Sequence, residues 1–313
     1  MKVSKFGMVF PGQGSQSVGM LSDLAKNFAI VKRIFAEASD VLGYDLWQLV
    51  QQGPAEELNK THQTQPALLA SSTAIYYVWR EQNGPPPVVV AGHSLGEYSA
   101  LVCAGVLDFK EAISLVELRG KLMEAAVPAG TGAMSAVIGL NDKAIAKICE
   151  YSIPVGEVFL VNFNAPGQSV IAGHKDAVEY ASKACMSAGA KRVLQLQVNV
   201  PSHCVMMKSA ADKLSEALQG VTFNTPQFAI ISNVDAKFIT APEDIRKALV
   251  YQMYNPVRWI ESVEFMEAQG IHHLLEVGPS KILTGLTKRI IATMKATAMN
   301  DSASLLAALS AVR

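Results

Sequence analysis

The sequence predicts an α/β protein with a mainly parallel sheet covered by helices on both faces, and with a smaller subdomain inserted into it. Two observations carry this prediction. Short apolar segments typical of buried strands alternate with helical segments along most of the chain, which is the pattern of parallel sheets. Between residues 129 and 200 the predicted order changes to β-α-β-β-α-β, the ferredoxin-like pattern. We therefore expect a large domain formed by residues 1–128 and 201–313, and a small subdomain formed by residues 129–200.

Composition favours a well-packed globular protein. Half of the 313 residues are hydrophobic and 17% are charged, and Lys plus Arg equal Asp plus Glu, so the formal net charge is zero. This balance argues against nucleic acid as a partner. No apolar stretch is long enough to cross a membrane, and the apolar run at residues 6–10 is too short for a signal peptide. We expect a cytoplasmic protein with no membrane partner.

Cysteine usage agrees with that compartment. Cys103, Cys149, Cys185 and Cys204 show no C-x-x-C spacing and no His/Cys pattern typical of a metal site. We expect buried free thiols in a reducing environment, and no bound metal.

The N-terminal segment predicts a strand over residues 6–10 and a glycine-rich loop over residues 11–16. The loop lacks the lysine of a phosphate-binding loop, and Ser17 stands where a dinucleotide fingerprint has its third glycine. A loop that brings backbone N–H groups close to a ligand fits better. Residues 20–83 then predict several helices, interrupted at Gly43 and at Gly53-Pro54.

The centre of the prediction is Gly92-x-Ser94-x-Gly96. Residues 88–91 predict a short buried strand before it, and residues 97–104 a helix after it. Strand, G-x-S-x-G and helix form the nucleophile elbow of hydrolase-like α/β cores. Such a turn exposes the serine hydroxyl and presents the N–H of Leu95 to the same space. A glycine-rich turn with a solvated serine is the alternative interpretation.

Arg119 lies in the next predicted helix, residues 109–126, which Asp108 can cap. Its neighbours three and four positions away are all apolar: Leu115, Val116, Leu122 and Met123. A guanidinium that leaves an apolar face needs an anion. A distant Asp or Glu, or a ligand, supplies that anion; a snorkelling side chain is a further possibility.

The inserted segment predicts two helices, at residues 142–149 and 175–188. Its last strand is predicted as a long alternating one over residues 192–200, because every second residue from Leu194 to Val200 is apolar. The other predicted strands cover residues 133–138, 158–163 and 169–172.

The C-terminal part begins with Val200-Pro201-Ser202-His203-Cys204, followed by a predicted helix to about Leu218. Proline and serine suit the first turn of a helix, so we expect His203 near the helix N-terminus. There the helix dipole would disfavour the imidazolium and leave His203 neutral enough to act as a base; a satisfied core or surface histidine is the alternative. Further strands are predicted at residues 230–233 and 271–277, with helices at 243–254, around Lys281–Arg289, and at 301–313.

Taken in order, the motifs resemble a known family. They are Phe10-Pro11-Gly12-Gln13-Gly14-Ser15-Gln16, Gly92-His93-Ser94-Leu95-Gly96-Glu97, Arg119, Val200-Pro201-Ser202-His203 and Glu276-Val277-Gly278-Pro279. This set is similar to the malonyl-CoA:acyl carrier protein transacylases of bacterial fatty acid synthesis, over essentially the whole chain. Ser280 departs from the glycine that the family pattern leads us to expect there.

The resemblance implies a role for each matching residue. Ser94 resembles the nucleophile that carries the malonyl ester, His203 its general base, and Arg119 the residue that binds the malonyl carboxylate. The N–H groups of Gln13 and Leu95 resemble the oxyanion hole, and Gln252 the residue whose main-chain carbonyl orients the His203 ring. His93, Gln65 and Asn162 are further pocket candidates, although an ordinary surface or capping role is open for Gln65. The implied partners are malonyl-CoA and acyl carrier protein, with no cofactor.

Two other functions stay open. A serine esterase or thioesterase would use water as the second nucleophile and needs an acidic third member, for which Asp212 and Asp235 are candidates. A non-catalytic docking module is the second alternative. Arg119 distinguishes the transacylase from a simple esterase, which needs no internal cation. Because the carrier proteins of this family are acidic, we expect a basic docking patch on the helix with Lys281, Lys288 and Arg289, or else a solvated helix face.

Overall fold

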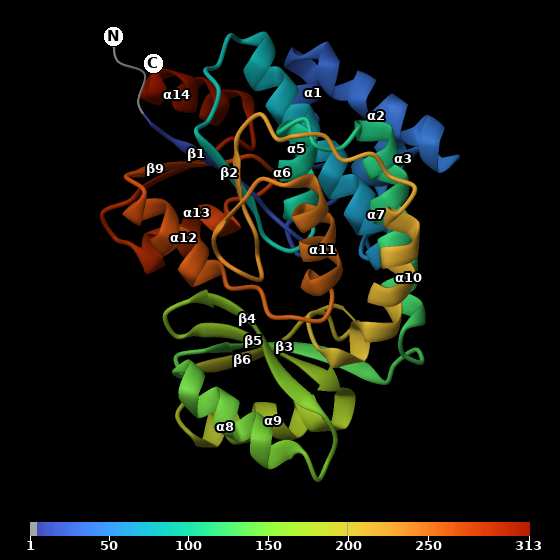
Figure 1. The fold of residues 1–313 in the computed structure, drawn as a ribbon, viewed down its shortest axis with the longest axis vertical. Coiled ribbons are helices and arrows are strands. Elements are labelled where there is room, and N and C mark those ends of the chain that lie inside the picture. The colour runs from blue at the N-terminus through green and yellow to red at the C-terminus, as the bar shows by residue number, and fades with distance from the viewer. Residues whose placement is uncertain (1–4, 199) are drawn as a thin grey trace.

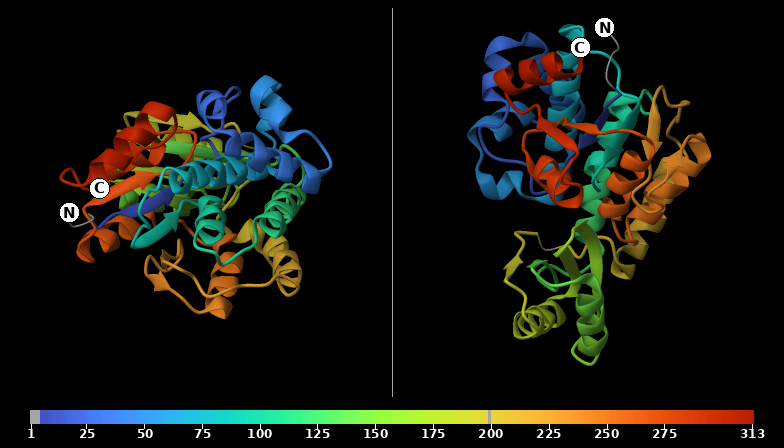
Figure 2. Two further views of the ribbon diagram at one scale, coloured as in Figure 1. Left: turned by 90° about the horizontal axis from the view of Figure 1, so that it is seen from above. Right: turned by 90° about the vertical axis from the view of Figure 1, so that its left-hand side faces the viewer.

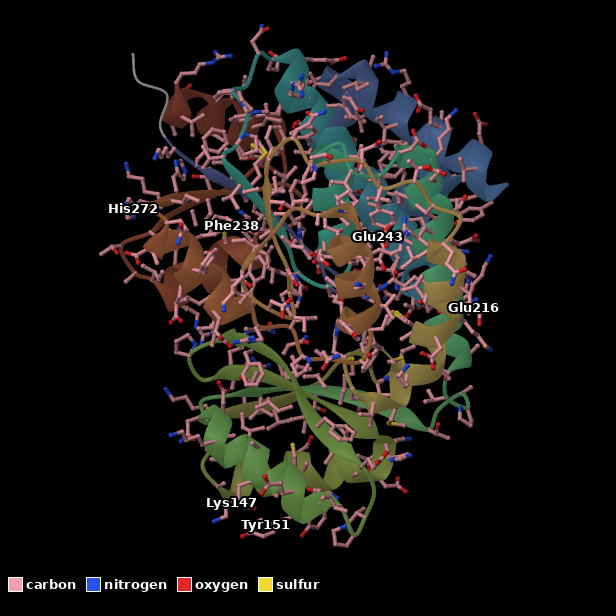
Figure 3. The ribbon with its side chains drawn as sticks, viewed as in Figure 1. Lys147, Tyr151, Glu216, Phe238, Glu243 and His272 are labelled. Atoms are coloured by element: carbon pink, nitrogen blue, oxygen red, sulfur yellow. The ribbon has the colours of Figure 1, made fainter. Side chains whose placement is uncertain are left out.

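The computed structural model describes residues 5–198 and 200–313, which form two parts, each built on its own sheet (Figure 1, Figure 2). The larger part holds a six-stranded sheet and both ends of the described chain. The smaller part, coloured green to yellow, projects from one side of it. Charged and polar side chains such as Lys147, Glu216, Glu243 and His272 point outward (Figure 3).

The large sheet has the strand order β10-β9-β1-β2-β7-β8. All neighbours in it run parallel except β7 and β8, so the predicted mainly parallel sheet is confirmed. Its two edge strands, β8 and β10, were not predicted, because each is short and only partly buried. The strands are β1 (Gly7–Phe10), β2 (Val89–Gly92), β7 (Ala229–Ile231), β8 (Phe238–Ile239), β9 (His273–Glu276) and β10 (Lys295–Ala298).

Helices cover both faces of this sheet, so that alternate residues of one strand pack in two different hydrophobic clusters. Met8 and Phe10 pack in the larger cluster, whereas Val9 packs in a second cluster with Trp259 and Leu283. The second cluster lies under α12 and α13, and the larger one under most of the other helices. These helices are α1 (Ser22–Asn27), α2 (Ala29–Leu42), α3 (Leu46–Gln52), α4 (Ala55–Leu58), α5 (Thr61–Glu81), α6 (Gly96–Cys103), α7 (Phe109–Ala125), α10 (Lys208–Leu218), α11 (Pro242–Gln252), α12 (Trp259–Ala268), α13 (Ile282–Ile290) and α14 (Ser302–Val312).

The smaller part follows the order β-α-β-β-α-β and forms an antiparallel sheet with strand order β4-β5-β3-β6. Its helices cover one face, where Ile145, Ile171 and Val178 form a separate core. The other face packs with Cys204 of the larger part. The elements are β3 (Gly132–Ile138), α8 (Asp142–Ser152), β4 (Val158–Ala165), β5 (Gln168–His174), α9 (Lys175–Ser187) and β6 (Arg192–Gln195).

The long strand predicted over residues 192–200 is wrong. Strand β6 ends at Gln195, whose partner is Ser135 in β3. Beyond it the chain leaves the sheet, and Val198 and Val200 line a cavity instead; residue 199 lies outside the described residues. Alternation predicts one buried face, but Leu194 is exposed, and Leu196 and Val198 pack against the helix-free face of the small sheet without being part of a strand.

The described residues contain no helix that is both long enough and apolar enough to span a membrane. All four cysteines are buried free thiols, in agreement with the prediction.

Candidate active site

The turn at Gly92-x-Ser94-x-Gly96 joins β2 directly to α6 and has no room for side chains at its glycines. A Cβ on Gly92 would lie 1.8 Å from the carbonyl carbon of Gly96, and a Cβ on Gly96 would lie 2.0 Å from the carbonyl oxygen of Phe10. Ser94 itself has a left-handed backbone, with φ of 52°. The turn is therefore tight and strained, and the strain falls on the serine.

An asparagine holds this strained turn in place. The backbone N–H of Ser94 donates to Oδ1 of Asn233 at 2.7 Å, and Nδ2 of Asn233 donates to the carbonyl of Gly92 at 2.5 Å. Asn233 is buried and follows the end of β7, the neighbour of β2 in the sheet. Both contacts are made at the carboxyl end of parallel strands, where α/β proteins place their sites.

Ser94 and His203 lie in hydrogen-bonding contact, with 2.8 Å between Oγ and Nε2. The other ring nitrogen, Nδ1, lies 2.7 Å from the main-chain carbonyl oxygen of Gln252. A carbonyl can only accept, so Nδ1 carries the proton and Nε2 of the neutral ring is free to accept the proton of Ser94. This is the geometry of a nucleophile next to its base.

His203 lies shortly before the start of a helix, as predicted, but Pro201 and Ser202 are not in its first turn. A short 3-10 helix begins only at Val205 and α10 only at Lys208, whereas His203 occupies a left-handed turn with φ of 65°. Burial of the ring is the main cause that lowers the pKa of His203 to about 3, and the positive charge of Arg119 adds to it. The imidazole therefore stays neutral at neutral pH, mainly because the ring is buried.

Both residues of the predicted oxyanion hole line the same cavity. Gln13 and Leu95 line the cavity together with Ser94. Within residues 5–198 and 200–313, neither backbone N–H has a hydrogen-bond acceptor. The loop that carries Gln13 sits tightly against the turn, since a Cβ on Gly12 would lie 2.5 Å from the carbonyl oxygen of His93. The two donors are thus free for an oxygen held at Ser94.

Arg119 reaches the cavity from α7 and is 1% exposed. Its Nη1 donates to Oε1 of Gln65 and its Nη2 to Oε1 of Gln252, both at 2.9 Å, while its Nε is buried and has no partner. In the described part of the chain no carboxylate lies within 4.0 Å of it, so the distant Asp or Glu that the sequence left open does not form a direct ion pair. A buried cation with an unused N–H is chemically suited to bind an anion.

Gln65 is not a surface or capping residue. It is 1% exposed, because α5 is buried along almost its whole length. Besides accepting from Arg119, its amide donates to the sulfur of Met123 at 3.4 Å.

The side chain of Gln252 connects the turn to Arg119. Its Nε2 donates to the carbonyl of Ser94 at 3.0 Å and to Oε2 of Glu97 at 2.6 Å, while its Oε1 accepts from Arg119. Glu97 is 2% exposed, and burial is the main cause that raises its pKa to about 7.

The two other pocket candidates lie on the side of the cavity that faces β4. Nε2 of His93 contacts Oδ1 of Asn164 at 2.8 Å, and its ring centroid lies 5.5 Å from that of Trp259. Burial lowers the pKa of His93, so this ring too is neutral. Asn162 lines the cavity, and its buried Oδ1 has no partner. His93, a residue of the turn, lines the cavity with its Nε2 already bonded to Asn164, whereas Asn162 offers a free acceptor to a ligand.

The cavity itself is small, about 80 Å³, and lies between the two parts of the molecule. The larger part contributes Ser94, Arg119 and His203, and the smaller part contributes Met134 and Asn162. Among the described residues, no three His, Cys, Asp or Glu side chains are grouped as a metal ion would require.

Comparison with known proteins decides the family. Residues 8–309 match the model of the acyl transferase domain. The chain is 62% identical to the malonyl CoA-acyl carrier protein transacylase of Escherichia coli K12 over 98% of this chain and 99% of that one. This chain belongs to the malonyl CoA-acyl carrier protein transacylases of the acyl transferase family.

Solved structures agree with this assignment. An acyl carrier protein S-malonyltransferase from Vibrio cholerae is 62% identical, with a TM-score of 0.94 over 97% of this chain and all of that one. A malonyl-transacylase in complex with its type II PKS acyl-carrier protein is 63% identical, with a TM-score of 0.97 over 98% of this chain and all of that one. The transacylase of Bacillus subtilis is more distant, at 43% identity over 96% of this chain and 94% of that one.

Sequence reasoning missed two polar residues of this transacylase, Asn233 and Glu97. Asn233 is the last residue of the strand predicted over residues 230–233, and a polar residue at the carboxyl end of a parallel strand was a usable signal. Glu97 follows the second glycine of the turn, but nothing local showed that α6 buries it.

Proposed function

We propose that this chain transfers the malonyl group of malonyl-CoA to the pantetheine thiol of acyl carrier protein through an ester on Ser94. One observation carries the choice of substrate. Arg119, a buried cation with an unused N–H, lines the same small cavity as the contact between Ser94 and His203. An acyl group with a free carboxylate satisfies that cation, and a neutral acyl group does not. The names of the relatives agree with this substrate.

The first half-reaction begins at the hydrogen bond between Ser94 and His203. Nε2 of His203 takes the hydroxyl proton as Oγ of Ser94 attacks the thioester carbonyl. The backbone N–H groups of Gln13 and Leu95 stabilise the oxyanion. The tetrahedral intermediate then breaks its C–S bond, and the proton on His203 passes to the sulfur of CoA. The main-chain carbonyl of Gln252 stabilises the imidazolium that exists between these steps.

The second half-reaction runs the same path with another thiol. The pantetheine thiol of the carrier protein gives its proton to His203 and attacks the malonyl ester. The intermediate collapses with loss of Ser94 Oγ, which regains the proton. Exchange of one thioester for another through a serine ester requires neither a metal nor a redox cofactor.

The proposed domain architecture follows the two sheets of the structure. We assign the turn at Ser94 as a nucleophile elbow of a hydrolase-like domain formed by residues 1–128 and 201–313. The strand order β4-β5-β3-β6 supports a ferredoxin-like plan for the subdomain of residues 129–200, as does its separate core.

A hydrolase with a Ser-His-acid triad is less well supported. Nδ1 of His203 faces a main-chain carbonyl where a triad has a carboxylate. Asp212 is exposed and contacts Lys208, and Asp235 is exposed as well. The remaining hydrolytic route would use the same two residues with water as the second nucleophile.

Intact-mass measurement tests the proposal. The protein incubated with malonyl-CoA should gain one malonyl group, and peptide mapping should locate it on Ser94. Ser94→Ala should gain none while keeping its fold. An unchanged yield in that variant, or a modified residue elsewhere, would overturn the assignment of the nucleophile.

A further inference from the structure

Two buried charges near the site have no direct ionic partner. Glu97 and Arg119 are 2% and 1% exposed, and each influences the pKa of the other through space. The amide of Gln252 lies between them, donating to Glu97 at 2.6 Å and accepting from Arg119 at 2.9 Å. When Glu97 is ionised the pair is neutral as a whole, and each charge is satisfied by an amide dipole rather than by direct contact with the opposite charge.

Because the Gln252 amide separates Glu97 from Arg119, the two charges do not form a direct salt bridge. A carboxylate bonded to Arg119 would occupy the N–H groups that the substrate needs. Held one amide away, Glu97 offsets the charge of the buried cation and leaves Nε of Arg119 without a partner. It also fixes the orientation of the Gln252 amide, since a flipped amide would turn its oxygen toward both Glu97 and the carbonyl of Ser94.

A malonyl carboxylate on Arg119 would change the charge balance. The site would then hold two buried anions and one buried cation, and an excess buried charge is costly. The direct contact with the substrate is the stronger of the two pairings, because it is charge-assisted. The remaining anion, Glu97, is therefore the one that loses its charge.

We propose that Glu97 is the resting counter-ion of Arg119, and that it takes up one proton from solvent when the malonyl carboxylate binds to Arg119. The inference rests on the function proposed above. The proton enters as the malonyl group arrives and returns to solvent when the group leaves on the carrier protein. Ester formation itself is proton-neutral, because the proton of Ser94 goes to the CoA sulfur. Glu97 is thus a positioning residue that keeps the site near neutrality in both states.

The surroundings of Glu97 make this exchange feasible near neutral pH. The charged groups that act on it are Arg119 from α7, which favours its ionised form, and Asp235 after β7, which opposes it. Tyr98, the next residue in α6, is neutral because burial raises its pKa to about 12. With the pocket empty the pKa of Glu97 is about 7, and a second buried anion raises it further.

Proton uptake during acylation is the direct test. The protein is mixed with malonyl-CoA in weak buffer containing a pH indicator, and adducts are counted by intact mass in the same sample. At about pH 7.5 we expect about half a proton or more per adduct, and at about pH 5.5 less than about a tenth, because Glu97 is then already protonated in the empty site. Uptake also makes kcat/KM for malonyl-CoA fall as the pH rises above about 7.

Two variants make the test specific. Glu97→Gln keeps the size of the side chain and an acceptor for Gln252, and should acylate without proton uptake and without the alkaline fall of kcat/KM. Glu216→Gln removes an exposed carboxylate on α10 that does not act on Glu97, and it should behave as the wild type. Adducts in the wild type without uptake at about pH 7.5, or uptake that persists in Glu97→Gln, would overturn the inference. If Glu97→Gln does not fold, the wild-type pH series decides. The absence of any adduct in the wild type would instead refute the proposed function.

Discussion

At the scale of single residues, selectivity depends on what the wrong substrate leaves unsatisfied. Arg119 makes two hydrogen bonds to amides and retains a buried N–H without a partner. Malonyl would complete these bonds in a planar, two-pronged contact. Acetyl fits the same space but leaves the cation unpaired, so the site discriminates by an uncompensated charge rather than by size.

Replacing Arg119 should therefore invert the preference of the site. Loss of one member of a buried charge pair costs about 2–5 kcal/mol, which corresponds to a loss of roughly 30- to 5,000-fold in kcat/KM for malonyl-CoA in Arg119→Ala. Acetyl transfer should hold or rise in this variant, and Arg119→Lys should rescue malonyl transfer only partly, because a point charge lacks the fork. Both substrates are measured in all three proteins. An equal loss for both in Arg119→Ala would make Arg119 purely structural.

Much of this residue-level chemistry was predictable, and the reason is local. The glycines around Ser94 and the apolar neighbours of Arg119 lie within a few positions of the residue whose role they indicate. The contacts of Glu97 and Asn233 could not be predicted in this way, since each is made with a residue more than 130 positions away in the chain. The position of His203 was predicted near the site, but the cause of its neutral ring was not, because burial depends on the whole fold.

At the scale of elements, the turn between β2 and α6 is the most crowded part of the site's backbone. Its glycines allow close backbone contacts, and Asn233, just after β7, bonds to the carbonyl of Gly92 and to the N–H of Ser94. The strain at Ser94 is thus stabilised by elements on both sides of the turn.

Gly92→Ala should destabilise the protein strongly, because the new Cβ would meet backbone atoms that no side-chain movement can relieve. We expect a loss of at least about 3 kcal/mol in the free energy of unfolding. Ser94→Ala is the matched control, and it removes one hydrogen bond worth about 1 kcal/mol. Denaturant titration of both variants checks this. Comparable stabilities would show that the turn tolerates a side chain at Gly92.

Elements with strong periodicity were predictable, and elements defined by their partners were not. The capped helix α7 and the buried strand β2 lie within a few residues of their predicted bounds. The edge strands β8 and β10 lack a clear pattern, because one of their sides has no strand to pair with. The segment after β6 shows the opposite error, since its apolar residues pack against the small sheet and line the cavity without forming a strand.

At the scale of the whole molecule, the active site lies where the two parts meet, so a carrier protein has to approach the seam between them. The exposed Lys288 and Arg289 lie in the last turn of α13, and Arg289 donates to the main-chain carbonyl of Pro166 in the smaller part. Lys281 is exposed at the other end of this helix. This basic face adjoins the seam and remains our candidate for docking.

Added salt should weaken carrier-protein docking more than it affects acylation by malonyl-CoA. Exposed charges are screened within about 8–10 Å at ordinary ionic strength, so transfer to an acidic carrier protein should fall with added salt while acylation by malonyl-CoA changes less. Lys281→Gln with Lys288→Gln should raise KM for the carrier protein and flatten its salt dependence. Identical salt responses of the two half-reactions would remove this face from consideration.

The central claim is that the ester on Ser94 is passed to a thiol. The direct measurement is a chase of isolated malonyl-enzyme with carrier protein bearing its pantetheine thiol, following enzyme, carrier protein and free malonate by mass. We predict that the malonyl group appears on the carrier protein as it leaves the enzyme, and that in the absence of the thiol the ester persists. Release of malonate at the same rate with and without the carrier protein would contradict the account and make the protein a hydrolase.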